Sequence, residues 1–493
     1  MGLLRAVDEP PRLSTGQQPV QAALQPVVSV IECLANGIYS SAAEEGHSEG
    51  LQEEHLVRET VATQTCEAIA TKILTIIASY GVHYERDTGL WNAFDEFLPM
   101  VTSHVVAGAP VRLLLPAFPF KENSKELVLG SLPDLGEELA LAHLQGLCDN
   151  ISVIYENGAE IHICSDGLVY NDLMGVSEEA AWEYGEAVRV MAASKKFRNI
   201  NFVRLWDLLE NPHRRFDQVN RENSKSYYLE HATSIRQKLF HRFGDAQFNA
   251  SAAVTTSEDW AKTHATYLNV LARKAIDGRE SIATQMMQRG KAYGSALTAN
   301  FPDYVRLSIH DSGGQGKLSL ALIPNPQEKG SIGLMPWRSV IAVDHDGSYR
   351  AVYPDQVLDT HEIIYKYGRP YFFRFKSDLY DWGNNLQIDV EHLYPCGIIV
   401  RPAKGSPSTR LIPLQKVRQL SNQFSPIIIR GFSDSLDKDK TKGLAYKTPM
   451  ENDEQSLHLT QKITYDSRTC LRLAWEKGDL LVDNNDDVFK IQT

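Results

Sequence analysis

Hydrophobic positions along the first third of the chain predict alternating strands and helices. Residues 111–118 form a nearly continuous apolar run that ends in a polar loop, a pattern typical of a strand buried on both faces. Apolar positions from Leu135 to Leu147 recur at helical spacing after Pro133-Asp134, and residues 159–164 form a second strand-like run. This order is a βαβ unit, and it predicts a parallel sheet.

The same alternation continues towards the C-terminus. Ser177, followed by Glu178 and Glu179, is a predicted N-cap, and a strand-like stretch follows at 201–205. We predict helices within 226–243 and 257–296, and strands at 304–310, 317–323, 339–343, 349–352 and 371–375. The predicted fold class is α/β: a Rossmann-like doubly wound sheet with helices on both faces, plus a small irregular C-terminal extension.

Composition divides the chain into three parts. Residues 1–55 are rich in Pro, Gln, Ser and Glu and predict a loosely ordered extension. An amphipathic helix within 63–80 opens a large domain, which we place at 56–400. Residues 401–493 contain polar and highly charged stretches and are predicted to form a separate segment.

Charge and motif content exclude several classes of protein. A net charge of −12 argues against a nucleic-acid partner, because phosphate backbones require clustered Lys and Arg. The six cysteines do not show zinc-site spacing, and neither a G-x-S-x-G nor an H-E-x-x-H motif occurs. No apolar run reaches the roughly 18 residues of a membrane-spanning helix. We therefore expect a soluble cytoplasmic protein without a membrane partner.

Polar loops follow both predicted strands of the βαβ unit. Lys121 follows the first strand, and Ser165-Asp166-Gly167 follows the second. Loops after the carboxyl ends of parallel strands line the ligand crevice of such sheets. Spacing alone favours the simpler interpretation, in which Lys121 is a solvated cation and Ser165-Asp166 caps a turn.

A second polar set lies near residue 310. Strict alternation places Arg306, Ser308 and His310 on one face of a strand, and Lys317 follows a glycine-rich connection. Arg and Lys bind anions, and His exchanges a proton near neutral pH, so these residues are candidates for an anion site. An antiparallel hairpin with an ordinary wet face explains the pattern equally well. A nucleotide loop is disfavoured, because Leu318 stands where Ser or Thr is needed.

Two blocks of sequence resemble the isocyanide (isonitrile) synthase family, which includes fungal spore-wall enzymes acting on tyrosine. The resemblance rests on LLPAFPFK (114–121), LPDLGE (132–137), ICSDG (163–167), RLSIH (306–310), Gly316-Lys317 and Pro336-Trp337. Two positions depart from the family pattern, in which Pro often follows the strand-end His and His follows Pro-Trp. Asp311 and Arg338 occupy those places here.

The resemblance implies an enzyme that converts the amino group of an aromatic amino acid, with tyrosine favoured, to an isocyanide. Ribulose 5-phosphate would be the carbon donor, and neither cofactor nor metal would be required. The implied partners are these two small molecules. By motif position, the candidate catalytic residues are His310, Lys317, Asp166 and Ser165, and the candidate substrate- and phosphate-binding residues are Lys121, Arg306, Ser308 and Trp337.

The C-terminal part shows a weaker resemblance. SPIIIRGF (425–432) looks like the start of a taurine dioxygenase-like domain, and WEKGDLLVDN (475–484) looks like a piece near its end. His458 is the only histidine between Phe432 and Trp475, where an H-x-[DE] iron-binding pair would be needed. We therefore expect a truncated segment without oxygenase activity, and a separate oxygenase acting on the product. The alternatives are a spore-wall enzyme making an N-formyl-tyrosine precursor of dityrosine, an inactive relic, and an iron/2-oxoglutarate oxygenase fusion.

Overall fold

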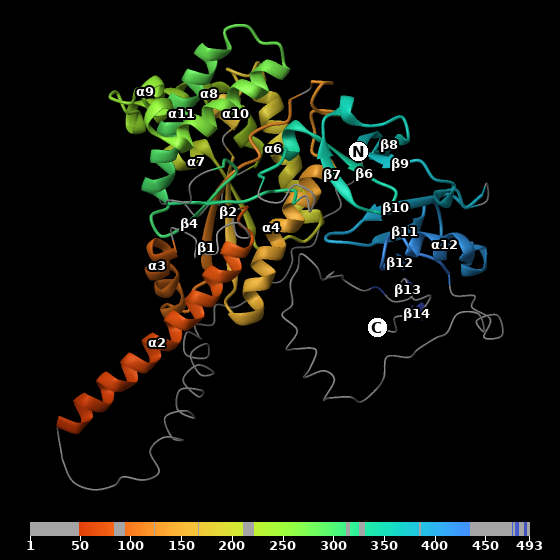
Figure 1. Cartoon of the computed structure of the whole chain (residues 1–493), viewed down its shortest axis with the longest axis horizontal. Coiled ribbons are helices and arrows are strands. Elements are labelled where there is room, and N and C mark those ends of the chain that lie inside the picture. The colour runs from red at the N-terminus through yellow and green to blue at the C-terminus, as the bar shows by residue number, and fades with distance from the viewer. Residues whose placement is uncertain are drawn as a thin grey trace, which may run out of the picture. The chain divides into compact units, whose positions relative to one another are not determined.

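A computed structural model describes most of the chain (Figure 1). The described residues are 49–82, 94–122, 124–165, 167–210, 221–311, 316–324, 331–383, 386–433, 476, 479–482 and 488–490. Contacts divide the chain into two units, residues 1–66 and 67–493. The described sheets and helices belong to the second unit, apart from the first part of helix α2.

A five-stranded sheet organises the part of the chain that carries the predicted site. All four of its strand pairings are parallel. Its order is β3-β2-β1-β4-β5, with β1 at Val111–Pro116, β2 at Ala159–Ser165, β3 at Ile200–Arg204, β4 at Val305–Ser308 and β5 at Leu318–Ser319. The strand order reverses between β1 and β4, which is the arrangement of a doubly wound sheet.

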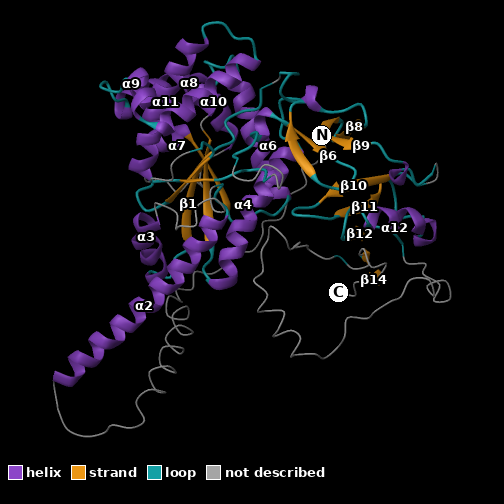
Figure 2. Cartoon of the chain, in the orientation of Figure 1, coloured by secondary structure: helices purple, strands orange, loops and turns teal. Residues whose placement is uncertain are grey.

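Helices cover this sheet on two sides (Figure 2). Helix α3 packs on β1 and β4, and α4 packs on β2 and β3. The described helices are α2 (Glu49–Ser79), α3 (Phe94–Val106), α4 (Leu135–Ile154), α5 (Gly167–Tyr170), α6 (Glu178–Ser194), α7 (Leu205–Glu210), α8 (Arg221–Phe243), α9 (Ala250–Thr256), α10 (Glu258–Arg273), α11 (Arg279–Asn300) and α12 (Leu414–Ser421). None of them is both long and apolar enough to cross a membrane.

Two further sheets follow in the second half of the chain. The first has the order β7-β6-β9-β8 and contains β6 (Val340–Val343), β7 (Tyr349–Val352), β8 (His361–Lys366) and β9 (Arg369–Phe375). The second has the order β10-β11-β12-β13-β14 and contains β10 (Ile388–His392), β11 (Ile398–Pro402), β12 (Ile427–Ile429), β13 (Leu480–Val482) and β14 (Val488–Lys490). Helix α4 packs on β6 and β9 as well as on the parallel sheet.

Local sequence explains why α4 begins where it does. The side chain of Asp134 accepts a hydrogen bond from the backbone N–H of Gly136, and Glu137 accepts one from the backbone N–H of Asp134. This capping box satisfies amide groups that the first helical turn leaves without partners. Ser177 caps α6 in a similar way by accepting a hydrogen bond from Ala180, as its position predicts.

The structure confirms the predicted fold class and corrects two local predictions. β4 and β5 pair in parallel, so the antiparallel hairpin interpretation of this region is wrong. β8 was not predicted, because its sequence, HEIIYK, is neither a continuous apolar run nor a strict alternation of apolar and polar residues. The C-terminal part contains regular strands, and β11 crosses residue 400, where we place a domain boundary. That division of the chain into domains remains a prediction.

Candidate active site

The topology of the parallel sheet brings the loop after β1 and the loop after β4 to the same edge. These strands are neighbours, and the strand order reverses between them. Ligands of doubly wound sheets bind in the crevice at such a switch point, outside the carboxyl ends of the strands. Residues 117–122 and 309–311 therefore occupy the position where the fold predicts a site.

The loops after β1 and β2 are tied closely together. Ser165 donates a hydrogen bond from Oγ to the carbonyl oxygen of Phe118, over 3.1 Å. A Cβ atom at Gly167 would lie only 2.6 Å from the carbonyl oxygen of Pro119, so a residue with a side chain does not fit there. Ser165 thus holds the loops together, and its predicted contact with substrate stays a prediction. Asp166 lies outside the described residues.

Lys121 lies in a buried ion cluster at the start of α4. Its Nζ atom is 2.6 Å from Asp134 Oδ2 and 2.9 Å from Glu137 Oε2, and Tyr184 donates a hydrogen bond to Glu137. Burial disfavours a charge on Lys121, but the two carboxylates outweigh this effect and raise its pKa. Burial raises the pKa of Asp134 to about 7. The predicted phosphate contact of Lys121 remains a prediction, and its described contacts are structural.

His310 follows β4 and is held by two serines. Ser308 Oγ accepts a hydrogen bond from the backbone N–H of His310, and Ser319 donates one to the His310 carbonyl oxygen. Its imidazole meets the ring of Tyr267 edge-on, with 5.9 Å between the ring centroids. Burial and the positive charges of Lys317 and Arg338 lower the pKa of His310 to about 4. The imidazole is therefore neutral at pH 7 and has a free nitrogen lone pair, and the lowered pKa makes it a weaker base than an ordinary imidazole.

Two predicted cations, Arg306 and Lys317, lie close enough to influence each other. Arg306 makes no ion pair with a carboxylate among the residues the structure describes, and burial lowers its pKa. Lys317 Nζ is 3.6 Å from Asp259 Oδ2, a loose pair. Burial also lowers the pKa of Lys317, and the charge of Arg306 adds to this effect. Buried cations that have few carboxylate partners within the protein form a favourable environment for an anionic ligand.

A third group of charges was not predicted from the sequence. Arg338 Nε lies 3.8 Å from Glu122 Oε1, and Lys274 forms an ion pair with the other oxygen of the same carboxylate. Glu122 is 2% exposed. Glu122 directly follows Lys121, and Arg338 directly follows Trp337. Their adjacency to predicted site residues could therefore have identified them as further candidates. For Lys274, at the C-terminal end of α10, we find no such signal.

Trp337 packs against the loop after β1. It lies in the 3-10 helix η1 (Pro336–Arg338), is 1% exposed, and packs against Phe118 with 5.3 Å between ring centroids. Phe118 has a φ of 55°, a left-handed conformation that is strained for a residue with a side chain. In the described structure Trp337 therefore contacts the loop after β1, and its predicted contact with substrate stays a prediction.

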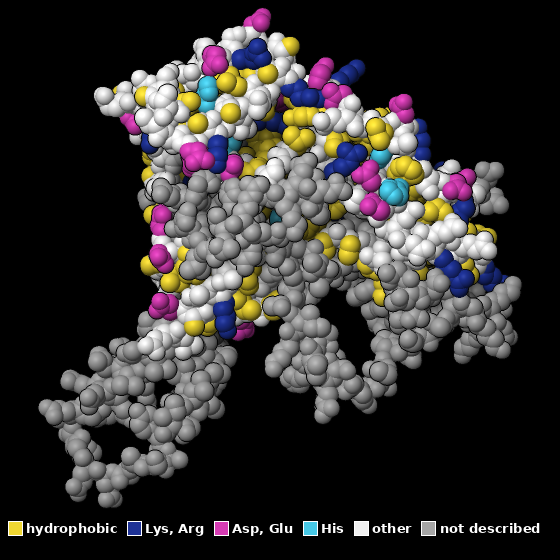
Figure 3. Space-filling view, viewed as in Figure 1, with side chains coloured by type: hydrophobic (Ala, Val, Ile, Leu, Met, Phe, Trp, Pro, Cys, Tyr) yellow, Lys and Arg dark blue, Asp and Glu magenta, His cyan; other side chains and the backbone are white. Residues whose placement is uncertain are grey.

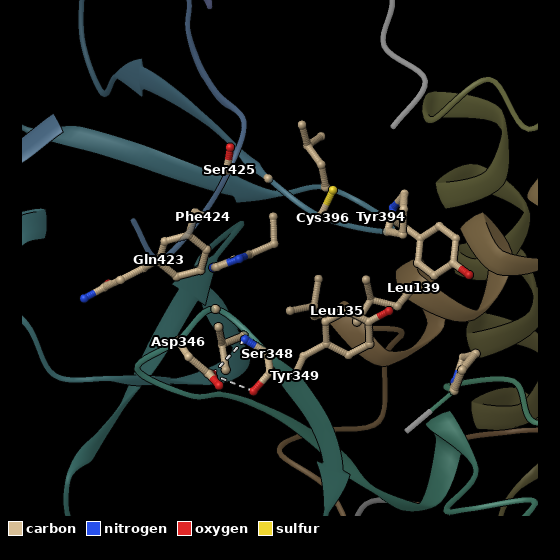
Figure 4. Close-up of a pocket in the computed structure, with 17 residues that line it drawn as sticks. Leu135, Leu139, Asp346, Ser348, Tyr349, Tyr394, Cys396, Gln423, Phe424 and Ser425 are labelled. Carbon is tan, nitrogen blue, oxygen red and sulfur yellow. Dashed lines mark hydrogen bonds between the residues drawn. The ribbon is translucent and has the colours of Figure 1, made fainter. Parts of the chain in front are cut away.

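A cavity of about 500 Å³ lies apart from these residues (Figure 4). It lies between α4, the β6–β7 hairpin and the loops around β10, β11 and β12, and none of the predicted site residues lines it. Its walls include Leu135, Leu139, Tyr349 and Phe424, with Cys396 at one side. On the face of the molecule drawn in Figure 3, basic and acidic side chains are interspersed.

Comparison with known proteins identifies the family. Residues 101–364 match the family model described as pyoverdine/dityrosine biosynthesis protein. This match covers more than half of the chain and includes the loops after β1, β2 and β4. The chain belongs to this family.

Three relatives are informative. Isocyanide synthase xanB of Aspergillus fumigatus is 45% identical over 394 residues, which cover 76% of this chain and 51% of that protein. Isocyanide synthase A of the same fungus is 33% identical, covering 75% of this chain and 60% of that protein. An L-tyrosine isonitrile synthase of Pseudomonas aeruginosa is 29% identical, covering 57% of this chain and 84% of that protein. The chain thus spans about half the length of the relative named first.

A solved structure has a similar fold. The PvcA protein from Pseudomonas aeruginosa matches with a TM-score of 0.54 and 24% sequence identity, covering 62% of this chain and 100% of that chain. This likeness confirms the predicted Rossmann-like α/β class. The family model and the relatives confirm the predicted resemblance to the isocyanide synthase family.

Proposed function

We propose that this chain is an isocyanide synthase that converts the amino group of an aromatic L-amino acid, tyrosine by preference, into an isocyanide. Ribulose 5-phosphate is the proposed carbon donor, and fungal secondary metabolism is the proposed setting. The relatives, which are isocyanide or isonitrile synthases by name, support the reaction class. The observation that carries the proposal is the position of His310 directly after β4 at the switch point of the sheet, where Ser308 and Ser319 hold its backbone. Arg306 lies on β4 and Lys317 directly precedes the neighbouring strand β5.

The proposed reaction places clear demands on the site. The amine attacks the ketone carbon of the sugar, water leaves to give an imine, and the remaining sugar carbons are then released. These steps need a group that accepts and returns protons, and cations that hold the phosphate and the carboxylate. A neutral imidazole meets the first need at pH 7. Arg306 and Lys317 meet the second, because they carry little internal neutralisation.

The test is mass spectrometry of the purified chain with ribulose 5-phosphate labelled at the ketone carbon. Tyrosine, tryptophan and valine are supplied separately. We expect an aromatic amino acid product that carries the label and has gained one carbon and lost two hydrogens. A product retaining a formyl oxygen would instead favour the spore-wall type of activity. Failure of folded protein to transfer label to any of the three would contradict the proposal.

A matched pair of variants connects this test to the site. His310→Asn removes the proposed proton acceptor and should reduce label transfer about 100-fold or more, as loss of a general base commonly does. His345→Asn changes a histidine in the turn between β6 and β7, and should leave label transfer unchanged. Normal turnover by His310→Asn would show that another group moves the proton.

A further inference from the structure

We propose that Arg338 binds the α-carboxylate of the amino acid substrate, with Glu122 as its positioning residue, while Arg306 and Lys317 bind the phosphate of the sugar. This inference rests on the proposed function and assigns the two anionic groups to separate parts of the site. Arg338 stands where the family pattern suggested a histidine, so motif matching gave it no role.

The geometry of Arg338 leaves its guanidinium available to an anion. Its side chain is 13% exposed, and its distance of 3.8 Å to Glu122 exceeds that of a good hydrogen bond. The Nε atom is buried and has no hydrogen-bond partner among the described residues. Burying an unpaired polar atom is costly, so an acceptor from a ligand would relieve that cost. A planar carboxylate matches the fork of a guanidinium.

The two cationic groups each contain two cations and one carboxylate, but they differ in how closely these charges are paired. Around Arg338, the carboxylate of Glu122 is shared with Lys274, which leaves an excess of one positive charge for a monoanion such as a carboxylate. Arg306 has no carboxylate partner in the described part of the chain, and Lys317 is only loosely paired with Asp259. The charges of that group are the less closely paired of the two, so it suits a phosphate monoester, which approaches two negative charges at pH 7.

The position of Arg338 relative to His310 gives the assignment its chemical meaning. Ser319, two residues after Lys317, donates a hydrogen bond to the carbonyl oxygen of His310. Arg338 lies beside Glu122 in the loop after β1, the strand that neighbours β4. The charges of both cations lower the pKa of His310, in agreement with this arrangement. In an α-amino acid the amine and the carboxylate are attached to the same carbon. A carboxylate held by Arg338 therefore places the amine near His310, and a phosphate held by Lys317 places the sugar on the side where that amine must attack.

The distinguishing experiment measures binding rather than turnover. Isothermal titration of the full chain compares tyrosine with tyrosinamide, and tryptophan with tryptophanamide, because the amides keep the ring and the amine but lose the negative charge. We expect the wild type to prefer the acids by roughly tenfold or more, since hydrogen bonds to charged groups are the stronger ones. Arg338→Gln should remove this preference and leave the affinity for ribulose 5-phosphate unchanged.

Controls separate a loss of binding from a loss of structure. Arg338→Lys keeps the charge but loses the planar fork, so it should retain part of the preference for acids. Arg350→Gln removes an arginine paired with Asp344 in the β6–β7 hairpin, and should bind like the wild type. Arg306→Gln should weaken ribulose 5-phosphate binding and leave the preference for acids over amides intact. Thermal unfolding of each variant verifies that it folds.

The outcomes distinguish this inference from the proposed function. If Arg338→Gln keeps the preference for acids, or loses sugar phosphate affinity instead, the assignment of Arg338 is overturned while label transfer by the wild type still supports the proposed function. If the wild type transfers no label and binds neither amino acid, the proposed function fails and this inference fails with it. Loss of the preference only in Arg338→Gln, with label transfer by the wild type, supports both.

Discussion

At the scale of single residues, the site separates charges that the sequence presents side by side. Lys121 and Glu122 are consecutive, yet Lys121 pairs with Asp134 and Glu137 while Glu122 faces Lys274 and Arg338. Motif position identified Lys121 as a residue of interest but gave no information on its partners. Partners are set by the tertiary structure, and a cation in a motif serves equally well as a structural ion or as a ligand.

Lys121→Met provides the test at this scale. Removing the cation leaves Asp134 and Glu137 buried without their partner, and breaking a buried pair in this way typically costs about 3–5 kcal/mol. We expect the free energy of unfolding, measured by urea denaturation, to fall by that order. Lys225→Met removes a surface lysine paired with Glu179, and should change stability far less. A stable Lys121→Met variant that binds sugar phosphate poorly would instead support the predicted ligand role.

At the scale of elements, the sequence predicted best those strands that are buried on both faces and those helices that are buried on one face. The apolar runs of β1 and β2 and the capped starts of α4 and α6 were predicted close to their observed bounds. The pairing of β4 with β5 was not, because alternation shows which face of a strand is buried but not the direction of its neighbour. The sequence also did not show that α10 contributes Asp259 and, just past its end, Lys274, since helical periodicity carries no information about distant contacts.

Gly167 tests how closely the loops after β1 and β2 must approach each other. Gly167→Ala places a Cβ 2.6 Å from the Pro119 carbonyl oxygen, so the two loops must separate. We expect a loss of about 1–3 kcal/mol in stability, as for other overpacked sites, and a lower rate of label transfer. Gly294→Ala adds a Cβ in α11 with no atom within 4 Å, and should be neutral or slightly stabilising. Equal behaviour of the two variants would show that the approach of the loops is not required.

At the scale of the whole chain, the C-terminal sheet connects segments that are far apart in sequence. β12 pairs with β11 in parallel and with β13 in the antiparallel sense, and about 50 residues separate β12 from β13. The sequence suggested a dioxygenase-like segment from about residue 401, and the described strands show that β10 and β11 belong to the same sheet as that segment. Lys195, just past the end of α6, pairs with Glu391 of β10 and so joins this sheet to the rest of the unit.

Asp479 tests whether this sheet is needed by the proposed site. Arg430 donates two hydrogen bonds to its carboxylate, at 2.8 and 2.6 Å, and Asp479 is 1% exposed, so the pair is buried and bidentate. Asp479→Asn should destabilise this sheet by about 3 kcal/mol, because it leaves Arg430 incompletely neutralised in a buried position.

Calorimetry distinguishes two outcomes. If the C-terminal sheet and the parallel sheet unfold separately, the substitution will lower the temperature of one transition only, and label transfer at low temperature will persist. A single transition that moves as a whole, with label transfer lost in proportion, would show that residues 67–493 unfold as one unit and that a division at residue 400 has no energetic meaning. The distinction depends on two contacts that join the parts: His143 of α4 contacts Tyr394, between β10 and β11, and Lys195 pairs with Glu391 of β10.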